Sequence, residues 1–337
     1  ETDGNVCRSF LGNNYATVSQ RPKLSVTYRD KTITAVSGDM GISDTYTYDT
    51  SSLDNNVTNR VSHAWGNLVS STALDAKLKN FPISLEYIYN SKLYKDSASS
   101  GDFYRYYGIS TSYKMGRGWK LSLVELMKYD SSNDIYLYVD NYGTEYSFIP
   151  DATSGLYTNA VIGASLDIDT ANNTVTLVNG DITRVFNSNG LLTSLECDDK
   201  TYTYNYTGTY ALSSVTSAGE TVISFTYTSN NLTGIGDYTI TYDSSANVTK
   251  ISDSYANVHE YQTMASMFAV RRSIDGYAYT YTFDSNKRIS NIKYCRYVNS
   301  VYNAVEETKI YYGTRYTVYQ NPGKDYDFSA TADNIYT

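Results

Sequence analysis

The chain has 337 residues, a formal net charge of -8, and 38 tyrosines against 27 lysines and arginines combined. This length is sufficient to bury a sizeable core in one large all-β domain or two smaller ones. The acidic balance argues against a nucleic-acid-binding surface, because phosphate binding requires clustered cations. Apolar runs are only a few residues long, whereas a membrane-spanning helix needs about 20, so no membrane insertion is expected.

The N-terminal part of the sequence is the less regular half. RPKLSVTYRD, residues 21–30, has the pattern of one strand, and we assign 1–38 to the terminal strand of a preceding β-domain. Residues 39–79 are rich in Ser, Asn, Asp and Thr, which indicates a polar linker or a loop excursion.

Strand signals dominate the C-terminal half. Tyr202, Tyr204 and Tyr206 alternate with small polar residues, and the same alternation returns at 238–242 and 277–283. A period of two predicts strands with an aromatic face and a polar face. Short turns rich in Asn, Asp, Ser and Gly follow these strands, so each unit is predicted to be a β-hairpin.

The hairpin units form an internal repeat. Successive anchoring aromatics lie 20, 21, 15 and 41 residues apart, and the last spacing is close to two units. Residues 255–275, inside that double spacing, match poorly and are either a degenerate unit or a helical turn. The anchoring aromatics are Phe186, Tyr206, Tyr227, Tyr242 and Phe283.

Three segments precede the repeats in a fixed order: NFPISLEYIYNS from Asn80, GRGWKLSLVELM from Gly116 and YVDNYGTEYSFI from Tyr138. Together with the hairpin units they resemble the RHS/YD-repeat family, and RPKLSVTY resembles the last strand of a DNRLRE surface domain. The resemblance implies an RHS-type opening region at 80–150 and a YD-repeat array at 151–337 that continues past the C-terminus. The implied fold is all-β, an array of antiparallel β-hairpins that coils into a curved sheet or partial shell.

The resemblance also implies a function. It suggests a non-catalytic extracellular structural and interaction scaffold, secreted or on a bacterial cell surface, forming part of a shell, stalk or fibre. Its partners would be the rest of its own polypeptide or identical neighbouring chains. A lesser alternative is part of a toxin-encapsulating shell whose effector lies outside this chain.

A second class of function is a carbohydrate-binding adhesin. Exposed aromatic rings stack on sugars, although strand aromatics also stabilise sheets by packing across strands. Trp119, inside GRGWKL, is expected in the core rather than in a platform. The candidate glycan or partner contacts are Trp65, Tyr104, Tyr106 and Tyr107.

Catalytic residue patterns are weak, so the chain is predicted not to be an enzyme, with a hydrolase as the third hypothesis. The two histidines, His63 and His259, lie in no nucleophile motif, so no catalytic triad is expected. Many carboxylates lie in turns, where capping is a better explanation than a catalytic acid pair. These turn residues include Asp198, Asp199, Asp243 and Asp284.

No cofactor or metal is predicted. DIDTANN from Asp167 and DNYG from Asp140 offer oxygen ligands, but neither is an EF-hand loop. The cysteines, Cys7, Cys197 and Cys295, lack CxxC spacing and are interpreted as small hydrophobic residues, mainly buried.

Overall fold

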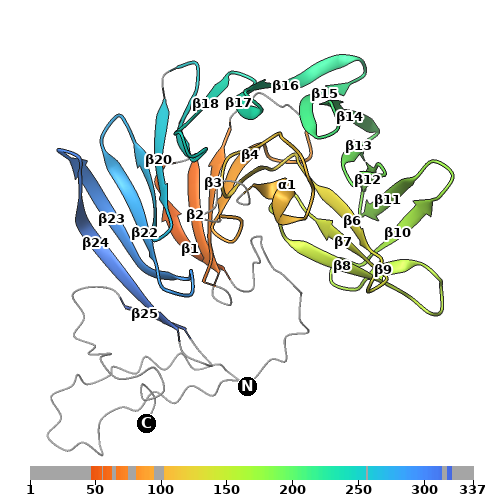
Figure 1. Cartoon of the computed structure of the whole chain (residues 1–337), viewed down its shortest axis with the longest axis horizontal. Coiled ribbons are helices and arrows are strands. Elements are labelled where there is room, and N and C mark those ends of the chain that lie inside the picture. The colour runs from red at the N-terminus through yellow and green to blue at the C-terminus, as the bar shows by residue number, and fades with distance from the viewer. Residues whose placement is uncertain are drawn as a thin grey trace, which may run out of the picture. The chain divides into compact units, whose positions relative to one another are not determined.

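Antiparallel β-strands make up almost all of the computed structural model (Figure 1). The structure describes residues 47–54, 56–62, 66–74, 81–94, 102–255, 257–312 and 317–320, and all of them belong to one compact unit, Val36–Thr337. Within these ranges there are 25 strands and one short helix. The predicted all-β array of antiparallel strands is therefore confirmed. The strand expected within 1–38 lies outside the described residues.

Five strands form the first sheet, in the order β1-β2-β3-β4-β5, and each is antiparallel to the next. They are β1 (Thr47–Ser52), β2 (Val57–Ser62), β3 (Leu68–Ala73), β4 (Glu86–Asn90) and β5 (Trp119–Leu121). Helix α1 (Phe103–Tyr106) lies between β4 and β5 in the chain. Asp102 caps this helix by accepting a hydrogen bond from the Tyr104 backbone N–H at 3.2 Å.

The remaining strands form one long antiparallel series in which each strand pairs with the next along the chain. The first ten are β6 (Leu126–Asp130), β7 (Ile135–Val139), β8 (Glu145–Pro150), β9 (Tyr157–Asn159), β10 (Ala164–Asp169), β11 (Thr174–Asn179), β12 (Ile182–Phe186), β13 (Leu192–Cys197), β14 (Lys200–Thr207) and β15 (Ala211–Ser217). The last ten are β16 (Glu220–Thr228), β17 (Asn231–Ile235), β18 (Tyr238–Tyr242), β19 (Val248–Ser252), β20 (Val258–Met264), β21 (Met267–Arg272), β22 (Tyr277–Phe283), β23 (Ile289–Val298), β24 (Val301–Tyr312) and β25 (Thr317–Gln320).

The series begins before the predicted boundary at residue 150. Strands β6, β7 and β8 belong to it, and β8 pairs with β9 across that boundary. An isolated antiparallel bridge also joins Leu126, at the start of β6, to Leu191, just before β13. The opening region predicted at 80–150 therefore contributes strands to both sheets.

The stretch 39–79 is not a linker, because the structure places β1, β2 and β3 in it. Val57 and Val61 are fully buried on β2 and alternate with polar residues, as a strand requires. Asn59 and Ser70 are fully buried as well. The polar composition that suggested a loop therefore belongs to a buried sheet, where Ser and Thr are compatible with strand geometry.

The first sheet packs against the array at β20–β22 through aromatic contacts. Tyr89 stacks on Phe268 with ring centroids 4.2 Å apart, and Trp119 meets Tyr261 edge-on at 5.0 Å. The hydroxyls of Thr72 and Tyr261 form a hydrogen bond of 2.6 Å across the same interface. Trp119 is fully buried, which confirms its predicted place in the core.

The irregular unit at 255–275 is a degenerate hairpin rather than a helical turn. Strands β20 and β21 pair from His259 with Arg272 to Met264 with Met267, leaving a two-residue turn. Its turn consists of Ala265 and Ser266 and has no Asp such as those that open the turns after Tyr242 and Phe283.

Candidate functional site

Two of the four predicted ligand contacts, Tyr104 and Tyr107, are core residues. Tyr104 is 2% exposed and donates its hydroxyl to the Tyr210 carbonyl at 3.0 Å, while Tyr107 is 5% exposed and donates to Glu145 Oε1 at 2.9 Å. Neither ring is open to a sugar in this structure, because α1 turns both into the core. Tyr106, at 36% exposed, reaches the surface, and Trp65 lies outside the described residues.

The anchoring aromatics occupy equivalent positions in their units. Each is the strand residue that follows a register shift, or β-bulge, and each pairs with an aliphatic residue at the first or second position of the next strand. In every unit the extra residue of the bulge lies on the following strand and is a Ser or Thr: Thr193, Ser213, Thr233, Thr249 or Ser290. The pairs are Phe186 with Leu192, Tyr206 with Leu212, Tyr227 with Leu232, Tyr242 with Val248, and Phe283 with Ile289.

Tyrosine hydroxyls link consecutive units. Tyr206 donates to the carbonyl of Leu192, the aliphatic partner in the unit before it, at 2.8 Å. Tyr242 donates to the carbonyl of Leu232 in the same way at 2.5 Å. These contacts give the repeated tyrosine a polar role in addition to its packing.

Removing these hydroxyls is expected to loosen the links between units. Tyr206→Phe and Tyr242→Phe should each lower the free energy of unfolding by about 1 kcal/mol, since each leaves a backbone carbonyl without its donor. Urea denaturation measures this. Tyr255→Phe is the matched control, because Tyr255 is 82% exposed. Equal stability of all three variants and the wild type would contradict the linking role.

A lead segment, residues 102–127, is bonded to the turns of successive units. Met127 N–H donates to the Gly190 carbonyl at 2.9 Å, and Lys114 N–H donates to the Asn230 carbonyl at 2.8 Å. Arg117 N–H donates to the Ala246 carbonyl at 3.1 Å. The three accepting residues share a left-handed backbone conformation, with φ of 76°, 64° and 62° in chain order. The turn conformation therefore aims each carbonyl at the lead segment.

A buried ion pair joins the lead segment to the first repeat. Glu125 is fully buried, and its Oε2 accepts hydrogen bonds from Arg184 Nε at 2.8 Å and from the Tyr138 hydroxyl at 2.7 Å. Lys120 is also fully buried, and its Nζ donates to the carbonyls of Asp140 and Asn141 at 3.1 and 2.6 Å. Burial lowers the pKa of Lys120 to about 8. A substrate has no access to these charges, which hold the fold together.

Two carboxyls have pKa values close to neutrality because they are buried. Burial raises the pKa of Asp102 to about 7 and that of Asp140 to about 6. Shifts of this kind occur in general acids, but they also arise in structural networks. Asp102 caps α1, and Asp140 Oδ1 accepts backbone hydrogen bonds from Tyr142 and Thr144, both at 2.8 Å. Both carboxyls thus have local structural partners.

Because of these two carboxyls, we expect the free energy of unfolding to fall as the pH rises from about 4 to about 7. Their folded-state pKa values exceed the ordinary 3.8, so over this range the folded state binds more protons than the unfolded state. Asp102→Asn should therefore raise the free energy of unfolding at pH 8 by roughly 2–4 kcal/mol and flatten the profile. Urea midpoints measured from pH 4 to 8 test this. Asp169→Asn, at an exposed turn, should leave the slope unchanged, and an unchanged slope in Asp102→Asn as well would refute the prediction.

The candidate metal and catalytic residues are used in turns and ion pairs. Asp169, in the DIDTANN segment, accepts backbone hydrogen bonds from Ala171 and Asn172. His259 Nε2 lies 2.6 Å from Asp54 Oδ2 and joins the array to the first sheet, whereas His63 lies outside the described ranges. No group of three or more His, Cys, Asp or Glu side chains in the described part of the chain is arranged to hold a metal ion.

The two cysteines that the structure describes carry free thiols. Cys295 is fully buried and lies 3.9 Å from the Thr280 hydroxyl, while Cys197 is half-buried. The interpretation of cysteine as a buried hydrophobic residue is therefore confirmed for Cys295 and holds in part for Cys197. Cys7 lies outside the described residues.

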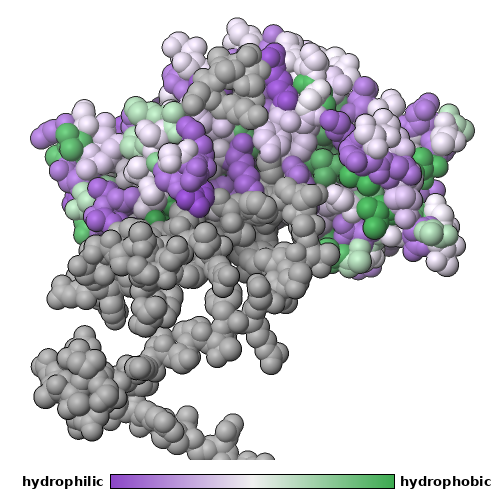
Figure 2. Space-filling view, turned by 60° about the horizontal axis from the view of Figure 1, so that its bottom comes forward, coloured by the Kyte–Doolittle hydropathy of each residue, from purple (hydrophilic) through white to green (hydrophobic). Residues whose placement is uncertain are grey.

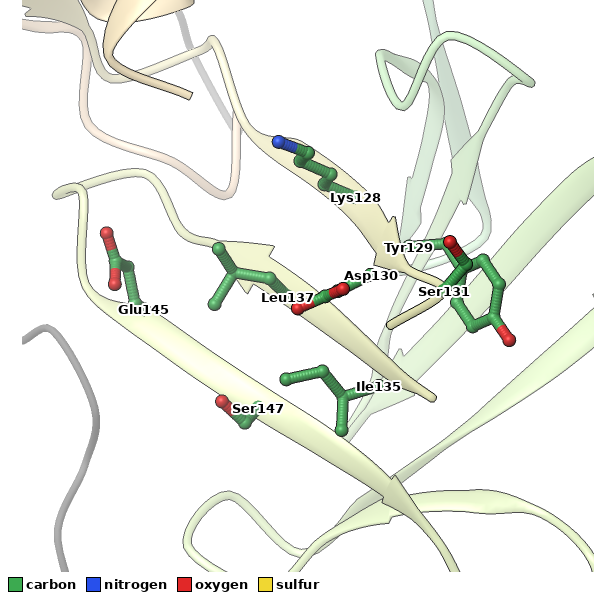
Figure 3. Close-up of a pocket in the computed structure, with 8 residues that line it drawn as sticks. All are labelled: Lys128, Tyr129, Asp130, Ser131, Ile135, Leu137, Glu145 and Ser147. Carbon is green, nitrogen blue, oxygen red and sulfur yellow. The ribbon is translucent and has the colours of Figure 1, made fainter. Parts of the chain in front are cut away.

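A hollow of about 550 Å³ lies on one face of β6, β7 and β8 (Figure 3). Figure 3 shows Lys128, Leu137 and Ser147 on the three neighbouring strands, with Glu145 at one end. Lys128 Nζ donates to the Tyr107 carbonyl at 2.8 Å, so Tyr107 ties this part of the sheet to α1. The lining residues are Lys128, Tyr129, Asp130, Ser131, Ile135, Leu137, Glu145 and Ser147.

A group of surface tyrosines at the same hairpin was not predicted from the sequence. Tyr129, Tyr136 and Tyr157 lie on β6, β7 and β9 and form one cluster. Tyr136 and Tyr138 do show period-two alternation, but the approach of Tyr157 depends on strand pairing across two turns. On the face seen in Figure 2, most of the coloured surface is hydrophilic, and hydrophobic residues form separate groups.

The described part of the chain contains no helix that is long and apolar enough to span a bilayer.

The chain was also compared with known protein families and with curated proteins. No protein-family model matches the chain, and a search of curated proteins finds no match.

Proposed function

We propose that the chain is a non-catalytic structural and interaction scaffold of RHS/YD-repeat type, part of a shell, stalk or fibre at or outside a bacterial cell surface. The ordered sequence motifs and the hairpin repeats support this proposal. Its partners are the rest of its own polypeptide or identical neighbouring chains.

The observation that carries the proposal is the bonding of one lead segment to several repeat units. Backbone N–H groups of Met127, Lys114 and Arg117 each meet a repeat turn, and Tyr206 and Tyr242 link units to their predecessors. A repeat array normally has contacts only between neighbouring units, so each unit can open separately. Here the hydrogen bonds from the lead segment to the repeat turns hinder the opening of a single unit. A shell or fibre that must withstand force requires such resistance.

Electron microscopy of the natural full-length protein, together with its intact mass, tests the proposal. Ordered polymers, or a longer chain that contains a closed array, are the expected result. A monodisperse monomer of 37.7 kDa would overturn the assembly of a shell, stalk or fibre. Cell fractionation provides a second test, since recovery only from the cytoplasm would contradict a surface role.

A further inference from the structure

Three tyrosine rings meet at the surface end of the β6–β7 hairpin. The ring centroids of Tyr129 and Tyr136 are 4.7 Å apart, and those of Tyr136 and Tyr157 are 4.8 Å apart. Tyr129 is 46% exposed, and the other two are half-buried. The cluster therefore combines rings fixed by packing with one ring face that solvent reaches.

Asp134 holds two of these rings in place. Its Oδ1 accepts the hydroxyl of Tyr129 at 2.8 Å and the hydroxyl of Tyr157 at 2.5 Å. Both bonds keep the pKa of Asp134 below its ordinary value, so the carboxylate is charged at neutral pH. Both also end on Oδ1, and no hydrogen bond to Oδ2 occurs within the described ranges. Oδ2 is thus placed to accept a hydrogen bond from a ligand hydroxyl.

Cross-strand packing alone explains aromatic pairs in many sheets. It explains Tyr129 and Tyr136, which are directly opposite each other on β6 and β7. It does not explain why Tyr157 from β9 joins them or why a turn carboxylate binds two of the hydroxyls. A rigid aromatic surface beside a charged acceptor has the features of a sugar site, because ordering of side chains is already complete before binding.

The surrounding charges select the class of sugar. Asp130 pairs with Ile135, the residue after Asp134, and so adds negative charge near Asp134, while the ammonium of Lys128 is bonded to the Tyr107 carbonyl. An anionic ligand would be repelled, whereas a neutral sugar presents hydroxyl donors and an apolar ring face. Tyr129 and Tyr136 alternate along β6 and β7 with Lys128, Asp130, Ile135 and Leu137, which line the hollow, so the tyrosine cluster and the hollow lie on opposite faces of the hairpin.

We propose that Tyr129, Tyr136 and Tyr157, with Asp134 as hydrogen-bond acceptor, form a binding site for a neutral hexopyranose unit of a polysaccharide. The sugar stacks on the exposed face of Tyr129 and donates a hydroxyl to Asp134 Oδ2. This site differs from the contacts predicted from the sequence, of which Tyr104 and Tyr107 are buried. It does not depend on assembly of the scaffold.

Isothermal titration calorimetry of the full chain tests the site, with cellohexaose, chitohexaose and mannohexaose as separate probes. Binding of at least one probe is expected, and Tyr129→Ala should weaken it at least tenfold, which corresponds to about 1.4 kcal/mol. Tyr255→Ala is the matched control, since Tyr255 is exposed at a turn outside the cluster and should bind as the wild type does.

Asp134→Asn provides a second variant that preserves the fold. Asp134 has a φ of 53°, and Asn is among the residues that tolerate this conformation. Weaker binding in this variant, with an unchanged circular dichroism spectrum, is expected. Absence of heat with all three probes at about 10 mM would overturn the proposal, and so would a Tyr129→Ala variant that binds as tightly as the wild type.

Discussion

Gly190→Ala is expected to lower the free energy of unfolding by about 3 kcal/mol or more. Gly190 has a φ of 76°, and a Cβ there would lie 2.1 Å from the Met127 carbonyl oxygen. Because the obstacle is backbone, no side-chain rotation relieves it. The clash also pushes Met127 N–H away from the Gly190 carbonyl, with which it forms a hydrogen bond of 2.9 Å.

Gly219→Ala is the matched control for this experiment. Gly219 has a φ of 85° in another hairpin turn, but a Cβ there would meet nothing within 4 Å. Its replacement should cost only the strain of a left-handed alanine, about 1–2 kcal/mol. Urea denaturation of both variants separates strain from the clash with the lead segment. Equal losses would show that Gly190 does not hold the close approach to Met127.

The second large effect is expected at the buried ion pair. Arg184→Met should lower the free energy of unfolding by about 3–5 kcal/mol, because Glu125 then keeps a buried charge without its cation. The side chain of Glu125 is fully buried and that of Arg184 is 10% exposed. Chemical denaturation measures the loss.

Two further variants establish that burial causes this effect. Arg288→Met removes the cation of a more exposed pair, in which Arg288 is 33% and Asp284 21% exposed, and should cost less than about 1 kcal/mol. The double variant Glu125→Gln with Arg184→Met removes both charges and should recover much of the lost stability. A double variant no more stable than Arg184→Met alone would refute the explanation.

Local patterns allowed the strands and turns of the repeats to be predicted. Period-two alternation and turn residues act over a few positions, so β14, β18 and β22 followed directly from their tyrosines. The equivalent bulge at each anchoring aromatic has no such signal, because it appears only when two strands are aligned. The left-handed backbone conformation of Ala246 and Lys287 could not be predicted from the sequence either, because neither residue is a glycine.

Burial that depends on long-range packing could not be predicted from the sequence. Tyr104 and Tyr107 look like surface residues in a polar stretch, yet partners at Tyr210 and Glu145 bury them. The stretch 39–79 looks like a loop until the array covers its sheet. Composition predicts burial only when the covering element is known. That element lies 106 residues away for Tyr104, at Tyr210, and 38 residues away for Tyr107, at Glu145.

The interface between the first sheet and the array also sets a delay during synthesis. Tyr89 leaves the ribosome 179 residues before Phe268, the ring on which it stacks. At translation rates of about 5–20 residues per second, the strands that cover the aromatic face of the first sheet are synthesised roughly 10 to 35 seconds after it. During that interval the nascent chain exposes Tyr89 and Trp119 to other chains. Chaperone binding to this early segment is therefore expected to matter more for yield than the stability of the finished fold.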